Sequence, residues 1–176
     1  GIDAAVLETA RGGLLRAGMG VRHVDVGAVL NVRSDHLGQK GIETLEQLAE
    51  VKRVVVEVAR DTAVLNADDP NVYRMGRHCD GRVVLFTMAK HKGEDGYDRV
   101  DGHTNRGNAA FCLGDTPQGE LIVLKHGPRK MPVLYTHLMP STFQGRARMN
   151  VANALAAAPA AWSAGAHLHD IRQGLR

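Results

Sequence analysis

The sequence has few of the residues that mark specialised protein classes. Its two cysteines, Cys79 and Cys112, lie far apart and form no C-x-x-C pair, which excludes a zinc ribbon and a thiol redox motif. The longest apolar stretch, 151–166, is too short to span a membrane and contains Asn153 and Pro159. Aromatic residues make up only 4% of the chain, so the core must be aliphatic. This cysteine usage fits a reducing compartment, and we expect the protein in the cytoplasm.

The chain also lacks a large excess of charge of either sign. The chain has 22 Lys and Arg against 19 Asp and Glu, and the excess of positive charge is scattered along it. Nucleic-acid and membrane partners are bound through a stripe or run of basic residues. We therefore expect no nucleic acid and no membrane among the partners.

What is present suffices for one folded domain. The 176 residues are 44% hydrophobic and 23% charged, which is typical of a globular domain with a core. The first residue is Gly1, and residues 2–7 already have the pattern of the body of a strand. We therefore expect 1–176 to be a piece of a longer protein.

Short β-rich runs alternate with helical patterns in the first half of the chain. The Val-, Leu- and Ala-rich runs show little alternation, which is typical of strands covered on both faces. Such an order predicts an α/β fold with a mostly parallel sheet flanked by helices. The expected strands are 4–9, 24–32, 63–66 and 82–87, and the expected helices are 11–17, 44–60 and 70–78.

The second half has a different pattern. Residues 90–107 are polar and rich in Gly and Asp, which predicts a loop or an insertion. Three short β-rich runs joined by Gly and Pro turns then predict a small antiparallel β element. These runs are 108–113, 120–126 and 132–137, and helices are expected at 147–165 and 167–175.

Polar side chains gather where the expected parallel strands end. Ligands bind at the carboxyl ends of such strands, because loops and helix N-termini converge there. For residues 66–70, ordinary turn chemistry and the start of a helix at Asp-Pro explain the pattern equally well. For Glu8 and His36 we favour a functional role. The residues at this edge are Glu8, Asn31, Asp35, His36, Asn66, Asp68 and Asp69.

Lys52 occupies an unusual position in its helix. Thr44 and Gln47 form a capping box that fixes where the helix begins. A step of about 100° per residue then places only apolar side chains around Lys52. A buried ammonium is costly unless it is paired or neutralised. Either the side chain snorkels to solvent, or it points into a polar site together with His36.

No phosphate-binding loop of the form G-x-x-x-x-G-K-[ST] is present in these residues. Gly12 and Gly13 open the first expected helix and could hold an anion, but they also permit close packing of that helix. The second explanation needs no ligand, and we prefer it.

An ordered set of motifs resembles the central, ATPase domain of the Mur ligase family. The motifs are E-T-A-R-G-G (Glu8–Gly13), N-V-R-S-D-H-L-G (Asn31–Gly38), V-K-R-V-V-V-E (Val51–Glu57), L-N-A-D-D-P (Leu65–Pro70) and T-F-Q-G-R-A-R-M-N-V-A-N-A-L-A-A (Thr142–Ala157). The likeness covers nearly the whole chain except 90–107. The first motif favours the branch of the family that adds arginine to an aspartate backbone polymer.

The resemblance implies particular roles for five residues. It implies that Glu8 and His36 are ligands of magnesium, with two ions expected, and that Lys52 is a catalytic residue carried as a carbamate, which is also a metal ligand. It implies that Asn150 and Asn153 bind the adenine of ATP. The activity it implies is ATP-dependent amide ligation through an acyl phosphate, with an amino acid and a polymer or peptide as substrates.

The resemblance also implies what lies outside this chain. The upstream segment with the phosphate loop and the downstream C-terminal domain are absent from 1–176, so we expect the fragment alone to be inactive and the full-length protein to be a homo-oligomer. Met149 stands where many relatives have His. The alternatives are a non-catalytic scaffold of the same fold, or a ligase for a peptidoglycan precursor or a folylpolyglutamate.

Overall fold

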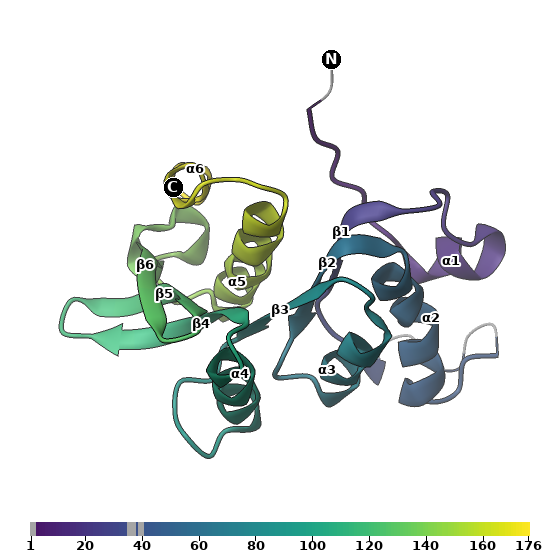
Figure 1. Cartoon of the computed structure of the whole chain (residues 1–176), viewed down its shortest axis with the longest axis horizontal. Coiled ribbons are helices and arrows are strands. Elements are labelled where there is room, and N and C mark those ends of the chain that lie inside the picture. The colour runs from purple at the N-terminus through teal and green to yellow at the C-terminus, as the bar shows by residue number, and fades with distance from the viewer. Residues whose placement is uncertain (1–2, 35–37, 39–40) are drawn as a thin grey trace.

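The computed structural model describes residues 3–34, 38 and 41–176. Within these residues, six strands form one sheet in the order β1-β2-β3-β4-β5-β6 (Figure 1). The pairings from β1 to β4 are parallel, and those of β4 with β5 and of β5 with β6 are antiparallel. The strands are β1 (Val24–Val29), β2 (Ala59–Asn66), β3 (Arg82–Thr87), β4 (Ala109–Thr116), β5 (Gly119–His126) and β6 (Arg129–Tyr135). The expected mostly parallel α/β sheet is confirmed.

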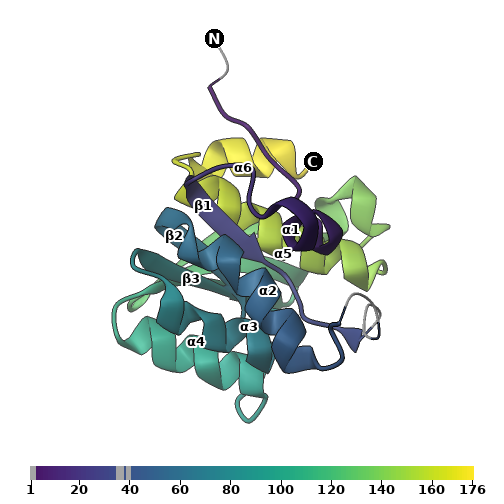
Figure 2. The same ribbon diagram turned by 90° about the vertical axis from the view of Figure 1, so that its right-hand side faces the viewer.

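Helices cover both faces of the sheet. On one face α2, α3 and α4 lie side by side over β1 to β4 (Figure 2), whereas α5 packs across the opposite face. The described helices are α1 (Arg11–Ala17), α2 (Leu45–Glu57), α3 (Pro70–Met75), α4 (Asp95–Asn105), α5 (Arg148–Ser163) and α6 (Leu168–Gly174), with short 3-10 turns η2 (Gly76–His78), η3 (Thr136–Leu138) and η4 (Pro140–Thr142). In the part of the chain that the structure describes, no helix has the length and apolar character needed to cross a membrane.

The core is aliphatic and has two halves, because successive residues of a strand face opposite sides. Val64 and Val84 lie in the half under α5, whereas Ala63 and Leu65 lie in the half under α2 and α3. Both faces of the central strands are therefore buried. This explains the near-continuous apolar runs in the sequence.

The segment before α1 is not a strand. Residues 3–10 are extended and exposed, and they project away from the body of the domain (Figure 1). The prediction of a strand over 4–9 is therefore wrong for this chain. A strand needs a partner for its backbone groups, and none of the described strands pairs with this segment. Val6 is accordingly 99% exposed.

The prediction of a loop over 90–107 is also wrong. Most of this segment is α4, the crossover helix between the parallel strands β3 and β4. Its sequence has little helix propensity, but Val100 and Thr104 are buried, and tertiary packing decides the conformation. The predicted antiparallel element exists, and it extends the main sheet because β4 pairs with both β3 and β5.

The first turn of α4 packs tightly because residue 96 is glycine. A Cβ at Gly96 would overlap the Asp68 carboxylate and lie 2.5 Å from the Thr87 hydroxyl oxygen. We expect Gly96→Ala to lower the free energy of unfolding by about 1–3 kcal/mol, the usual cost of overpacking. Chemical denaturation of the purified variant measures this loss.

Gly102 gives a matched control in the same helix. The nearest atom to a Cβ there is the flexible end of Arg106, 3.8 Å away. Gly102→Ala should therefore stabilise the domain by about 0.5–1 kcal/mol through helix propensity alone. Equal losses in the two variants would show that close packing at Gly96 is not the cause.

His103 makes stability depend on pH. Its ring is buried, and its Nε2 donates to the Val83 carbonyl at 2.9 Å. Burial lowers the pKa of His103 from its ordinary value of 6.5. Below about pH 6.5 the unfolded chain binds a proton that the folded chain does not, so the free energy of unfolding falls as the pH falls. Between pH 7.5 and 5, His103→Gln, which keeps an N–H donor, should lose less stability than the parent chain in thermal unfolding. Parallel curves for the two proteins would contradict this role.

Candidate functional site

The strands β1, β2 and β3 end at one edge of the sheet, and a hollow of about 290 Å³ lies there. Its walls include Asn31, Val32, Asn66, Asp68 and Asp69. Asn31 and Val32 follow β1, Asn66 ends β2, and Asp68 and Asp69 follow β2. The structure therefore brings together four of the seven polar residues that the sequence placed at the carboxyl ends of separate strands: Asn31, Asn66, Asp68 and Asp69.

The helix that carries Lys52 begins as its capping box predicts. The Gln47 backbone N–H donates to the Thr44 hydroxyl at 3.2 Å, and the Gln47 side chain accepts from the Thr44 backbone N–H. Leu48 and Val56 are fully buried on the inner face. Gly27 of β1 has no side chain, so the backbone of α2 can approach the sheet closely.

Lys52 is half-buried, and its amine is held at the carboxyl edge of β1. The stem lies on the inner side of α2, and Nζ donates to the Asn31 carbonyl at 2.7 Å. The side chain thus reaches the polar edge of the sheet. This position agrees with the expectation of a polar site, whereas His36, the expected neighbour, lies outside the described residues.

The L-N-A-D-D-P residues form hydrogen bonds that fix neighbouring loops. Asn66 Nδ2 donates to the Leu30 carbonyl at 2.8 Å, and its Oδ1 accepts from the Asp68 N–H. The Asp68 carboxylate accepts from the Thr87 hydroxyl and from the Met88 N–H. Asp69 caps α3, as the Asp-Pro sequence predicts.

Glu8 and Lys52 come from different parts of the chain, and the structure shows no contact between them. Glu8 lies in the exposed segment before α1 and makes no hydrogen bond or ion pair with another described residue. His36 and Asp35 lie outside the described residues. No group of three or more His, Cys, Asp or Glu side chains suited to a metal occurs in 3–34, 38 and 41–176.

Asn150 and Asn153 lie in the first two turns of α5. Asn150 Nδ2 donates to the Ser141 carbonyl at 2.5 Å, which ties the start of the helix to the loop before it and leaves the amide oxygen to accept a hydrogen bond. Asn153 is exposed, and the neighbouring Met149 is 81% exposed. The loop before α5 contains Phe143 with a positive φ of 50°, which is rare for an aromatic residue.

An ion-pair network at the start of α5 was not predicted from the sequence. Arg148 donates to Glu120 at 2.7 Å, and Lys90 pairs with both Glu120 and Asp115. The hydrogen bond from Lys90 to Asp115 raises the pKa of the lysine. The network joins α5, the β4–β5 hairpin and the loop after β3. The spacing of these residues in the sequence gave no signal of the network, because the partners are far apart in the chain.

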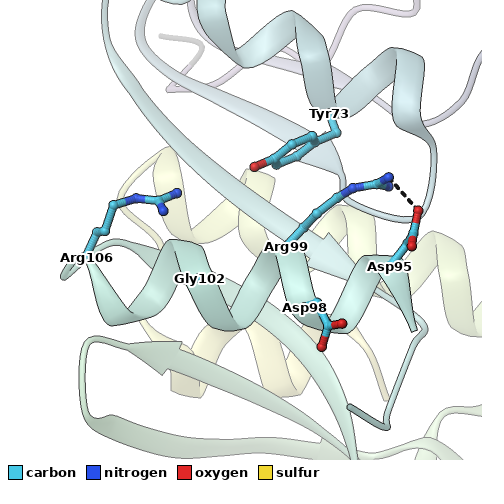
Figure 3. A pocket seen from close by; sticks show the side chains of 6 residues that line it. All are labelled: Tyr73, Asp95, Asp98, Arg99, Gly102 and Arg106. Carbon is cyan, nitrogen blue, oxygen red and sulfur yellow. Dashed lines mark hydrogen bonds and ion pairs between the residues drawn. The ribbon is translucent and has the colours of Figure 1, made fainter. Parts of the chain in front are cut away.

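A larger hollow of about 360 Å³ lies between α3 and α4 (Figure 3). Its main side chain, Arg99, donates to Asp95 and to the Ala67 carbonyl, both at 2.7 Å, and lies over the Tyr73 ring. Arg99 is thus satisfied within the fold. The hollow at the ends of β1 and β2 is lined by Asn31, whose carbonyl accepts from Lys52, and by the polar residues after β2, so it is the better candidate site.

Comparison with known proteins gives a consistent result. The model of the Mur ligase middle domain matches residues 1–161. Cyanophycin synthetase of Crocosphaera subtropica is 41% identical over 99% of this chain, and that of Synechocystis is 40% identical over the same share. The chain covers 19% of each of these two proteins.

A second group of relatives is more distant. The UDP-N-acetylmuramoylalanine–D-glutamate ligase of Desulfitobacterium hafniense is 31% identical over 87% of the chain, which covers 29% of that protein. Both groups carry ligase or synthetase names. The similarity to the two cyanophycin synthetases covers nearly the whole chain, so it includes the strands and helices that position the candidate site.

Proposed function

The chain belongs to the Mur ligase family, as a middle domain, and from this premise we propose that it is the central part of an ATP-dependent amide ligase of the cyanophycin synthetase type. The full-length protein would join arginine to the side-chain carboxylates of an aspartate backbone polymer. The identity of 40–41% over 99% of the chain supports this substrate class over a peptidoglycan precursor, for which the identity is 31% over 87%.

The observation that carries the proposal is the position of Lys52. A lysine on the inner face of α2 reaches the carboxyl edge of a parallel sheet, where ligands of this fold class bind. A neutral lysine amine can add CO2: the nitrogen forms a bond to carbon, a proton is lost, and the product is an anionic carbamate. This change would turn a cation into an oxygen donor at that edge.

The chemistry of the donor set fits magnesium and ATP. Carboxylate oxygens from Glu8 and a Lys52 carbamate are hard ligands of the kind that Mg²⁺ prefers, and the family resemblance adds the imidazole of His36. Bound magnesium would offset phosphate charge. The exposed amide of Asn153 and the Asn150 amide oxygen can exchange hydrogen bonds with an adenine edge.

The proposed reaction has two steps. A substrate carboxylate oxygen attacks the γ-phosphorus of ATP, ADP leaves, and an acyl phosphate forms. The amine of the second substrate then attacks the acyl carbon, phosphate leaves, and the nitrogen loses a proton. The chain would contribute positioning and electrostatic stabilisation, which dominate catalysis of phosphoryl transfer.

Other properties of the full-length protein are part of the same proposal. We expect a homo-oligomer in the cytoplasm, acting on amino-acid and polymer substrates. Cys79 and Cys112 are unpaired in the structure, which is compatible with a reducing compartment. Sedimentation of the full-length protein measures the oligomeric state.

A substrate screen tests the proposed function. The full-length protein is given MgATP, an aspartate polymer and each amino acid in turn, and phosphate release is measured. We expect release that depends on both arginine and the polymer. Release with D-glutamate and a peptidoglycan precursor would assign the other ligase class, and failure to bind nucleotide or magnesium in titrations would favour the non-catalytic scaffold.

Substitution of Lys52 tests the residue that carries the proposal. In the full-length protein, Lys52→Ala should reduce turnover by at least about 100-fold, the cost of losing a group that stabilises transition-state charge. Its circular dichroism should match that of the parent, and a short carboxylic acid should restore part of the activity by replacing the carbamate.

Arg53 provides the matched control for this experiment. It is the next residue of α2, and its guanidinium pairs with Glu57 on the outer side of the helix. Arg53→Ala should change turnover by less than about twofold, because such surface pairs contribute little. Full activity in Lys52→Ala would overturn the assigned role.

A further inference from the structure

The peptide unit between Asn31 and Val32, just after β1, is held by side chains at both its carbonyl and its N–H. The carbonyl of Asn31 accepts from Lys52 Nζ at 2.7 Å, and the N–H of Val32 donates to Asp69 Oδ2 at 2.7 Å. These two backbone groups belong to the same planar unit. Fixing both of them fixes the plane of the peptide and the direction in which its carbonyl points.

The peptide before it is also held by the loop between β2 and α3. Asn66 Nδ2 donates to the Leu30 carbonyl at 2.8 Å. The described pairing of β1 with β2 ends at Val29 and Leu65, so residues 30–32 lie beyond the ladder. Side chains from the L-N-A-D-D-P motif thus take the place of strand partners for this stretch.

The two oxygens of Asp69 have separate roles. Oδ1 accepts from the Asn71 and Val72 N–H groups at 2.9 and 3.1 Å and caps α3, whereas Oδ2 accepts from Val32. Asn or Ser would serve as a helix cap just as well. Neither has a second acceptor for the Val32 N–H, so capping alone does not account for an aspartate here.

We infer that Asp69 is a positioning residue for Lys52, acting through the Asn31–Val32 peptide. The negative charge of Asp69 strengthens the hydrogen bond at the N–H end, and in the unmodified chain the ammonium of Lys52 strengthens the one at the carbonyl end. A carbamate nitrogen on Lys52 keeps one N–H, which can still donate to Asn31 and so aim the two carbamate oxygens. This inference rests on the proposed function of Lys52.

The test uses the full-length protein with Asp69→Asn and, as a second variant, Asp69→Ser. Both keep a cap for α3 and lose the acceptor for Val32. Hydrogen exchange resolved to single amides should become at least about tenfold faster at Val32 and stay slow at Asn71 and Val72. Turnover should fall about 10- to 100-fold with an unchanged KM for ATP, since misplacing a group that positions the reactants costs rate.

Asp95→Asn is the matched control. Asp95 pairs with Arg99 on α4 and is 82% exposed, so the substitution removes one charge without touching the Asn31–Val32 peptide. Exchange at Val32 and turnover should equal those of the parent. A loss like that of Asp69→Asn would mean that net charge, and not the hydrogen bond to Val32, is responsible, and would overturn the inference.

The outcomes separate this inference from the proposed function. Parent-like exchange at Val32 or parent-like turnover in Asp69→Asn, with Lys52→Ala inactive, overturns the positioning role and leaves the function of Lys52 standing. Full turnover in Lys52→Ala overturns both. Fast exchange at Asn71 and Val72 as well as at Val32 in both variants would reduce Asp69 to a helix cap and would also overturn the positioning role.

Discussion

The backbone that leaves β1 depends on hydrogen bonds from side chains, and the candidate site depends on that backbone. Once a strand passes the end of its ladder, its N–H and carbonyl groups must find other partners. Here Asn66 at the end of β2, Asp69 at the start of α3 and Lys52 on α2 supply them. Three elements far apart in the sequence are thereby joined at the edge where the parallel strands end.

The two-sided core makes this junction possible. Because both faces of β1 to β3 are covered, the helices α2 and α5 are held on opposite sides of the same sheet edge. Lys52 on α2 approaches that edge from one side, and Asn150 and Asn153 at the start of α5 belong to the other side. A ligase that must hold a nucleotide and a reacting carboxylate can use such an arrangement, with rigid helices on both sides and short loops between them.

Several charged side chains have structural roles in this chain. Asp68 joins the loop after β2 to Thr87 and Met88, and the Lys90, Glu120 and Arg148 network anchors the first turn of α5. These contacts hold the loops in one arrangement. The position of Lys52 at the carboxyl edge of the sheet is then set by the fold itself.

Local patterns determined much of the fold. The Thr44–Gln47 box gave the start of α2, Asp69–Pro70 gave the start of α3, and the apolar runs gave the buried strands, because each signal lies within a few residues. Tertiary structure alone decided that 4–9 pairs with none of the described strands, that 95–105 is helical, and that Asp69 meets Lys52 across one peptide. Periodicity and spacing report only what neighbours in sequence do. A hydrogen bond between residues 32 and 69 depends on how the strands are ordered in space, and that order arises only when the whole core packs.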